Sequence, residues 1–240
     1  MATARRTPAS PSKATSGGRR PVLVAGVRRG AAHRRRVCRV RADAFRKQAV
    51  VEEDRNGIAS ANFLTGDGVK SFTLRHESGA TAAFDNVLGV YEIGVDGAIS
   101  NVRVAFESSR DAEAGDAFTV GALSDGARLG FFLAQDGADD LADAIAGGDS
   151  FAFVDEGAPA NALDTCLPTL TADGDAFDDL IVHHSAAGLN IGGVEQMLSG
   201  ATTDQGGRLF IGVEDLAPNQ TNDFDFNDMV CSVDKAIDIV

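Results

Sequence analysis

The chain has no tryptophan, one tyrosine and three cysteines, and it contains no long apolar run. A transmembrane helix needs about 18 or more consecutive apolar residues, so we expect no membrane span. Because other aromatic residues are scarce, the core must rest on the 14 phenylalanines together with valine, isoleucine and leucine. Three cysteines do not make a disulfide framework. Cys166 and Cys231 could pair, but two separately packed thiols are the favoured interpretation.

Acidic residues are absent from residues 1–42, which carry twelve Arg or Lys, whereas residues 43–240 carry the remaining ten bases and all 35 acids. A basic, serine-containing segment without acids is typical of an organellar transit peptide. Val40-Arg41-Ala42 also resembles the cleavage context of chloroplast precursors. We therefore expect a disordered, cleaved leader over residues 1–42 and a plastid location. The alternatives are a basic nucleic-acid-binding arm and a mistaken upstream extension of the reading frame.

Residues 61–240 are expected to form one β-rich domain after an irregular linker at residues 43–60. Short segments alternate apolar and polar residues, and Gly- and Asp-rich turns separate them. This period of two predicts an all-β fold, an antiparallel, jelly-roll-like β-sandwich. The expected strands cover residues 71–75, 87–93, 99–106, 117–120, 128–134, 151–154, 180–183, 208–213 and 227–233.

Three local features refine this prediction. Asp96-Gly97 lies between two strand segments and predicts a hairpin. Residues 138–146 are helix formers with Leu141 and Ile145 four positions apart, followed by two glycines, which predicts one short surface helix. Phe131 and Phe132 are adjacent in a predicted strand, so their side chains point to opposite faces. We expect that strand to be covered on both sides, rather than to expose one ring.

A stretch near the C-terminus concentrates carboxylates. Five of them lie between Glu214 and Asp228. If the second half of this stretch is extended, the side chains of Asp223, Asp225 and Asn227 share one face. Carboxylates about 6–7 Å apart repel by roughly 2.5 kcal/mol at the effective dielectric of a protein surface, so a neutralising ion is expected. Hard Ca²⁺ suits oxygen ligands, whereas softer metals prefer His or Cys.

The sequence therefore predicts a calcium site in this stretch, with a solvated acidic turn as the plain alternative. A helix-loop-helix calcium loop fits poorly, because Asp228 stands where that loop needs glycine and Asp234 replaces its final glutamate. The candidate ligands are Glu214, Asp215, Asp223, Asp225, Asn227 and Asp228. Asp228 lies on the other face of an extended segment, so it either binds the ion across a bend or caps the turn.

The stretch 212–230 resembles the C-terminal signature of the domain of unknown function 4114 family, with Gly212-Val213-Glu214-Asp215-Leu216 followed by Asp223-Phe224-Asp225-Phe226-Asn227-Asp228. The resemblance covers roughly residues 60–235. It implies a β-rich, calcium-associated module of the kind found in secreted or surface proteins of bacteria, so a secreted or cell-surface location is the alternative to the plastid. Gly192 and Gln196 depart from the family pattern, which usually has Asp and His there, so a ligand from the Asn190 loop is in doubt.

No catalytic arrangement stands out. His183, His184 and Ser185 are consecutive, so they cannot form a relay among themselves, and no nucleophile elbow is present. Zinc binding through His183 and Cys166 lacks ligand spacing. We therefore expect a non-enzymatic calcium-binding module with a structural or adhesive role and a glycan or protein ligand. The alternative is a carbohydrate or ester hydrolase that uses acidic residues with His183 or His184. The acidic domain is not expected to bind nucleic acid.

Overall fold

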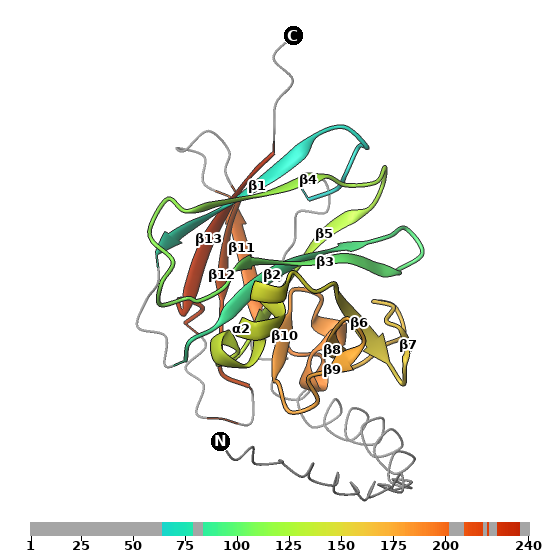
Figure 1. Ribbon diagram of the computed structural model, residues 1–240. Coiled ribbons are helices and arrows are strands. Elements are labelled where there is room, and N and C mark those ends of the chain that lie inside the picture. Colours follow the sequence, from blue (N-terminus) through green and yellow to red (C-terminus); the bar gives the residue numbers. More distant parts are fainter. Residues whose placement is uncertain (1–63, 79–83, 202–208, 218–219, 221–224, 236–240) are drawn as a thin grey trace, which may run out of the picture.

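The computed structural model describes residues 64–78, 84–201, 209–217, 220 and 225–235, which form a β-sandwich of two antiparallel sheets with one α-helix (Figure 1). The expected all-β fold class is thus confirmed. The expected leader and linker, residues 1–60, lie outside the described residues. No helix in the described part of the chain is long and apolar enough to cross a membrane.

The first sheet has five strands in the order β11-β12-β13-β1-β4. It contains β1 (Ser71–Ser78), β4 (Ala117–Ala122), β11 (Met197–Ala201), β12 (Leu209–Val213) and β13 (Met229–Lys235). The chain enters this sheet near both ends of the domain, so strands distant in sequence pair directly. β1, for example, pairs with β13 from Phe72 opposite Lys235 to Ser78 opposite Val230.

The second sheet has the order β10-β5-β2-β3-β6-β8-β9, with β7 beside β6. Its strands are β2 (Val87–Ile93), β3 (Ile99–Phe106), β5 (Arg128–Ala134), β6 (Phe151–Asp155), β7 (Ala158–Pro159), β8 (Thr169–Ala172), β9 (Asp175–Ala176) and β10 (Val182–His184). Two short 3-10 turns, η1 (Ala187–Leu189) and η2 (Ile191–Gly193), follow β10. All nine predicted strands are present, and the hairpin predicted at Asp96-Gly97 joins β2 to β3. The sequence prediction missed β7, β8, β9 and β11.

The two hydrophobic cores lie on opposite faces of the second sheet. The main core fills the space between the sheets, with Phe72 of β1 and Phe131 of β5 among its members. The other core lies between the outer face of the second sheet and α2 (Ala138–Gly147), which contributes Leu141. Phe132 belongs to this outer core, so the strand that carries both phenylalanines is covered on both sides, as predicted.

Residues of β2 and β5 approach each other closely in these cores. A Cβ atom added at Gly130 would overlap the ring of Tyr91, and one added at Gly89 would overlap the ring of Phe132. These glycines therefore make room for the rings of Tyr91 and Phe132. Cys231 of β13 is a free thiol buried in the main core, so it is not paired with Cys166. Cys166 is disulfide-bonded, so the expectation of two separately packed thiols holds for Cys231 and is wrong for Cys166.

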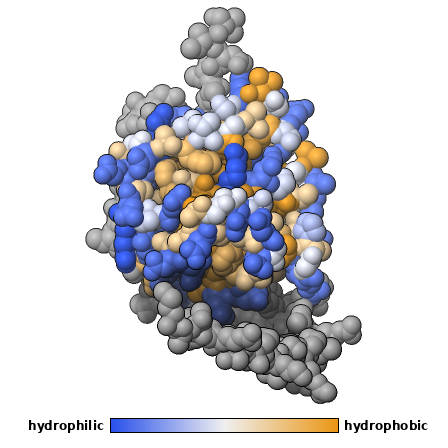
Figure 2. Space-filling view, in the orientation of Figure 1, coloured by the Kyte–Doolittle hydropathy of each residue, from blue (hydrophilic) through white to orange (hydrophobic). Residues whose placement is uncertain are grey.

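On the face drawn in Figure 2, polar residues surround small apolar areas. Among the described residues, four large apolar side chains are exposed: Val69, Val95, Leu163 and Ile181. Isolated exposed residues of this kind are normal on the surfaces of folded domains.

We predict that Gly130→Ala destabilises the fold by about 1–3 kcal/mol, because the added methyl group overpacks the core against Tyr91. Gly188→Ala is the matched control, since the nearest atom to its new methyl group is the Ala162 carbonyl oxygen at 4.0 Å. Urea unfolding of both variants measures the difference. Equal stability of the two variants would contradict the packing argument.

Candidate metal centre

The centre forms where β12 ends and β13 begins. These strands are antiparallel neighbours, and Val213, the last residue of β12, pairs with Met229, the first residue of β13. Glu214 and Asp215 therefore leave one strand at the same edge where Asp228 enters the next. Antiparallel pairing thus brings together carboxylates that are 13 or 14 positions apart in the sequence.

One carboxylate oxygen from each of Glu214, Asp215 and Asp228 lies within 4.8 Å of the other two. Glu214 and Asp215 are almost completely buried, and Asp228 is half-buried. At an effective dielectric constant near 20, two unit charges 4.8 Å apart repel by about 3.5 kcal/mol. Such a group is costly unless protons, hydrogen-bond donors or a cation offset the repulsion.

Backbone amides supply part of that compensation. The Asp215 amide donates to Asp228 Oδ2 over 2.8 Å, so Asp228 caps the turn after β12. The Leu216 amide donates to Glu214 Oε1 over 3.3 Å. Asp215 Oδ1, in contrast, is buried and makes no well-formed hydrogen bond among the described residues, although the Phe84 backbone lies close enough to Asp215 to lower its pKa.

Burial and the nearby Asp228 carboxylate raise the pKa of Asp215 from 3.8 to about 6, although a hydrogen bond from Asn86 works in the opposite direction. Burial is the largest cause, because it disfavours the charged form. Without a cation, the folded protein therefore holds a proton on Asp215 at mildly acidic pH. A proton and a metal ion are competing ways to neutralise the same group.

Asn86, immediately before β2, ties the second sheet to this centre. Its side-chain amide donates to Asp215 Oδ2 over 2.9 Å, and its side-chain oxygen accepts from the Asp136 amide at 3.0 Å. Asn86 is itself fully buried. The carboxylate of Asp215 thus lies between the two sheets, held by a residue that the sequence pattern did not single out.

His183 and Gln196 hold the backbone of the same turn. His183 Nε2 lies 3.0 Å from the Asp215 carbonyl oxygen, and its Nδ1 lies 3.3 Å from Gln196 Nε2. Gln196 Nε2 also donates to the backbone carbonyl of Leu216 over 2.7 Å. The backbone carbonyl of Gln196 accepts a hydrogen bond from the backbone amide of Glu214 at 2.9 Å. Both contacts of His183 suit a neutral imidazole that donates from Nε2, and burial lowers its pKa to about 4.

The other predicted ligands are placed differently. Asp225 and Asn227 are exposed, and their side chains bond to each other, with 2.5 Å between Asn227 Nδ2 and Asp225 Oδ2. Phe226 has a φ of 56°, so the segment is not extended and the expected row of side chains on one face does not form. Asp223 lies outside the described residues. The structure therefore brings together Glu214, Asp215 and Asp228 of the six.

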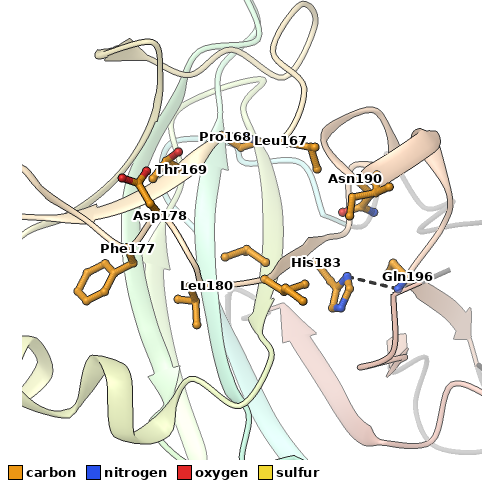
Figure 3. A pocket seen from close by; sticks show the side chains of 12 residues that line it. Leu167, Pro168, Thr169, Phe177, Asp178, Leu180, His183, Asn190 and Gln196 are labelled. Atoms are coloured by element: carbon orange, nitrogen blue, oxygen red, sulfur yellow. Dashed lines mark hydrogen bonds between the residues drawn. The ribbon is translucent and has the colours of Figure 1, made fainter. Parts of the chain in front are cut away.

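In the described part of the chain, neither His183 nor His184 forms a hydrogen bond with a side-chain carboxylate. His184 packs edge-to-face against Tyr91 and Phe153, and burial lowers its pKa to about 3. His183 lines a pocket, but it touches Asp215 only through the backbone, and the carboxylate that lines this pocket, Asp178, lies on its other side (Figure 3). Both histidines are buried, although they face opposite sides of β10.

The sequence pattern missed three residues that shape the centre: Asn86, His183 in its positioning role, and Gln196. No protein-family model matches the chain, and no curated protein or solved structure matches it either.

We predict that, in chelator, the wild-type protein gains stability relative to Asp215→Asn as the pH falls. Because the pKa of Asp215 is about 6 when folded and 3.8 when unfolded, the folded state binds the extra proton between these values. Burying the charge costs stability at neutral pH, and this cost disappears on acidification. With allowance for solvent screening, the free energy of unfolding of the wild type should rise by about 1–2 kcal/mol relative to Asp215→Asn between pH values of about 7 and 4.5. Urea unfolding measures it, and a pH-independent gap between the two proteins would contradict it.

Proposed function

We propose that the described domain is a non-enzymatic calcium-binding β-sandwich, in which Glu214, Asp215 and Asp228 bind the ion. The observation that carries this proposal is the buried group of three carboxylates, in which Asp215 Oδ1 makes no well-formed hydrogen bond among the described residues. A buried polar atom of this kind needs an explanation, and a bound ion is one of the accepted ones. A cation at this position would neutralise charges that otherwise repel.

The chemistry of the donors favours calcium. The group offers only carboxylate oxygens, and hard cations prefer oxygen ligands. The nearest imidazole, that of His183, is already engaged on both nitrogens. Calcium accepts six to eight oxygen ligands in irregular geometry, so three side chains with backbone carbonyls or water would suffice. Magnesium demands a more regular octahedron.

The ion would act as a cross-link within the fold. Its ligands come from the end of β12 and the entry to β13, and Asn86 extends the connection to the second sheet. Binding to the folded state alone stabilises it by about 2.7 kcal/mol at one hundred times the dissociation constant. This supports a structural or adhesive module, as the resemblance to the domain of unknown function 4114 family also implies.

The histidines give less support to the alternative, a hydrolase. A general base should have a pKa near the working pH, and burial lowers the pKa of His183 to about 4 and that of His184 to about 3. His183 is also occupied in holding the Asp215 backbone. A plastid location, with removal of residues 1–42, remains part of the proposal.

Calcium should raise the melting temperature of the chelator-treated protein by about 5–10 °C at one hundred times the dissociation constant, because about 2.7 kcal/mol is added to a domain of this size. Magnesium at the same concentration should give a smaller shift. Differential scanning calorimetry measures both. A melting temperature that responds to neither calcium nor chelator would end the proposal.

Asp215→Asn should abolish the calcium response and, in chelator at neutral pH, leave the protein as stable as the wild type or more so, since it removes a buried charge. Asp225→Asn is the matched control, because Asp225 is exposed and outside the group of three. Isothermal titration with calcium separates the two variants. Equal losses of affinity would move the site to the exposed residues 225–227.

A further inference from the structure

The second sheet is incomplete along one edge of β3. The first half of this strand is covered, because Val102 pairs with Phe151 of β6 and the Ile99 amide donates to the Ala160 carbonyl over 3.1 Å. β6 begins at Phe151, and the backbone just before it bonds to Asp173 instead of β3. In the described part of the chain, residues 103–106 therefore have β2 on one side and no paired strand on the other.

This half of β3 has backbone groups to offer. An antiparallel strand directs its N–H and C=O groups alternately to its two neighbours. The groups that residues 103–106 direct away from β2 make no backbone hydrogen bond with the residues that the structure describes. An edge of this kind is a template on which another extended chain can pair.

A groove of about 570 Å³ borders this open edge. Residues 101–104 of β3 and Glu107, just after the strand, line it together with Phe118 of β4. Ile145 and residues 148–151, which lead from the end of α2 into β6, also line it. The groove shares no residue with the candidate metal centre or with the contacts that support it. Its volume lies in the range of roughly 300–1,000 Å³ that is typical of ligand sites.

Apolar side chains along the groove are only partly covered. Val104, Phe118, Ile145 and Phe151 are each half-buried, so part of their apolar surface contacts water. When an extended peptide is added to a sheet edge, its backbone supplies hydrogen bonds and every second side chain packs on one face. A strand docked beside β3 would therefore satisfy the edge and cover these side chains at the same time.

The available charge in the groove is negative. Glu107 is exposed and Asp149 is half-buried, and neither carboxylate forms a hydrogen bond or an ion pair with the described residues. α2 also ends here, at Gly147, with no basic residue in its last turn. The C-terminus of a helix carries a partial negative charge, which adds to that of the carboxylates.

Arg103 is the one basic residue that lines the groove, and its guanidinium group is engaged within the fold. It lies over the ring of Phe118, 5.7 Å from the ring centre, and one Nη donates to the Val120 carbonyl. Its charge also lowers the pKa of Glu92, after the hydrogen bonds that Glu92 accepts. The groove is therefore complementary to a ligand that brings positive charge.

We propose that this groove binds an extended basic segment of another protein, which pairs with residues 103–106 of β3. Lysine or arginine side chains of the segment lie near Glu107 and Asp149, and its apolar side chains cover Val104 and Ile145. The chain's own basic stretch, residues 1–42, is removed under the plastid proposal, so the segment comes from a partner. The inference does not rest on calcium binding.

A peptide of alternating lysine and valine is the probe, with a peptide of alternating glutamate and valine as its acidic match. The full chain is labelled on isoleucine methyl groups and titrated by NMR, once in chelator and once in calcium. We expect the lysine–valine peptide to bind with a dissociation constant below about 1 mM. It should shift the methyl signal of Ile145, which lines the groove, and leave that of Ile211 in the main core unchanged.

Methylated backbone amides test strand pairing separately from charge. One peptide is methylated at the valine amides and another at the lysine amides, and both keep the charge of the probe. Alternate N–H groups of a strand point to opposite sides, so only one set can bond to β3. One methylated peptide should therefore bind about tenfold more weakly than the probe, and the other should bind nearly as well.

Two variants with matched controls test the charge. Glu107→Gln and Asp149→Asn should each weaken binding of the lysine–valine peptide by about two- to fivefold, the size expected for exposed ion pairs. Glu113→Gln and Asp143→Asn should have little effect, because these exposed acids do not line the groove.

The proposal fails if the lysine–valine peptide gives no saturable shift at Ile145, or if the glutamate–valine peptide binds as tightly. Equal effects of Glu107→Gln and Glu113→Gln would reduce the binding to a general attraction by the acidic domain. Equal affinities of both methylated peptides and the probe would rule out strand pairing. A peptide of residues 19–29 that binds more tightly than the probe would assign the groove to the chain's own leader. Titration in chelator decides each outcome, so this proposal and the calcium proposal can fail separately.

Discussion

The antiparallel pairing of β12 with β13 is the constraint on which the centre depends. Val213 lies opposite Met229, so the residues just beyond each strand end meet at one edge of the sheet. A shift of one residue in this register would turn every side chain of the strand to the other face. Gly212 adds a second condition, because a Cβ atom there would overlap the Phe226 carbonyl. Residue 212 must therefore lack a side chain for the segment that carries Phe226 and Asp228 to pack against the end of β12.

The second sheet contributes rigidity rather than charge. Asn86 reaches the Asp215 turn from just before β2, His183 reaches it from β10, and Gln196 reaches it from the segment before β11. Each of these side chains is buried and contacts the backbone or carboxylates of residues 214–216. A turn held this way cannot move its carboxylates apart to relieve their repulsion. This preorganisation is what makes a buried acidic group suitable for an ion.

His183 and Gln196 also line the pocket drawn in Figure 3, so this cavity and the candidate metal centre share a boundary. The imidazole of His183 is neutral and both of its nitrogens are hydrogen-bonded, so it holds the Asp215 turn in place without adding a charge to either site. The cavity and the candidate metal centre differ in chemistry as well. The fold therefore places a largely apolar cavity beside a compact group of carboxylates.

The sequence by itself determined the all-β class, because the period-two pattern and the Gly- and Asp-rich turns are local signals that antiparallel strands require. It also identified Glu214, Asp215 and Asp228 among the candidate ligands, since carboxylate density is visible without a fold. Only the tertiary structure decided which carboxylates meet. The positive φ of Phe226 turns the segment out of the extended form, and strand pairing selects Asp228 instead of Asp225. Asn86 could not be recognised from sequence, because its contact with Asp215, 129 positions away, leaves no local pattern. Gln196 reaches Leu216 only through the pairing of β11 with β12, which the sequence pattern did not predict.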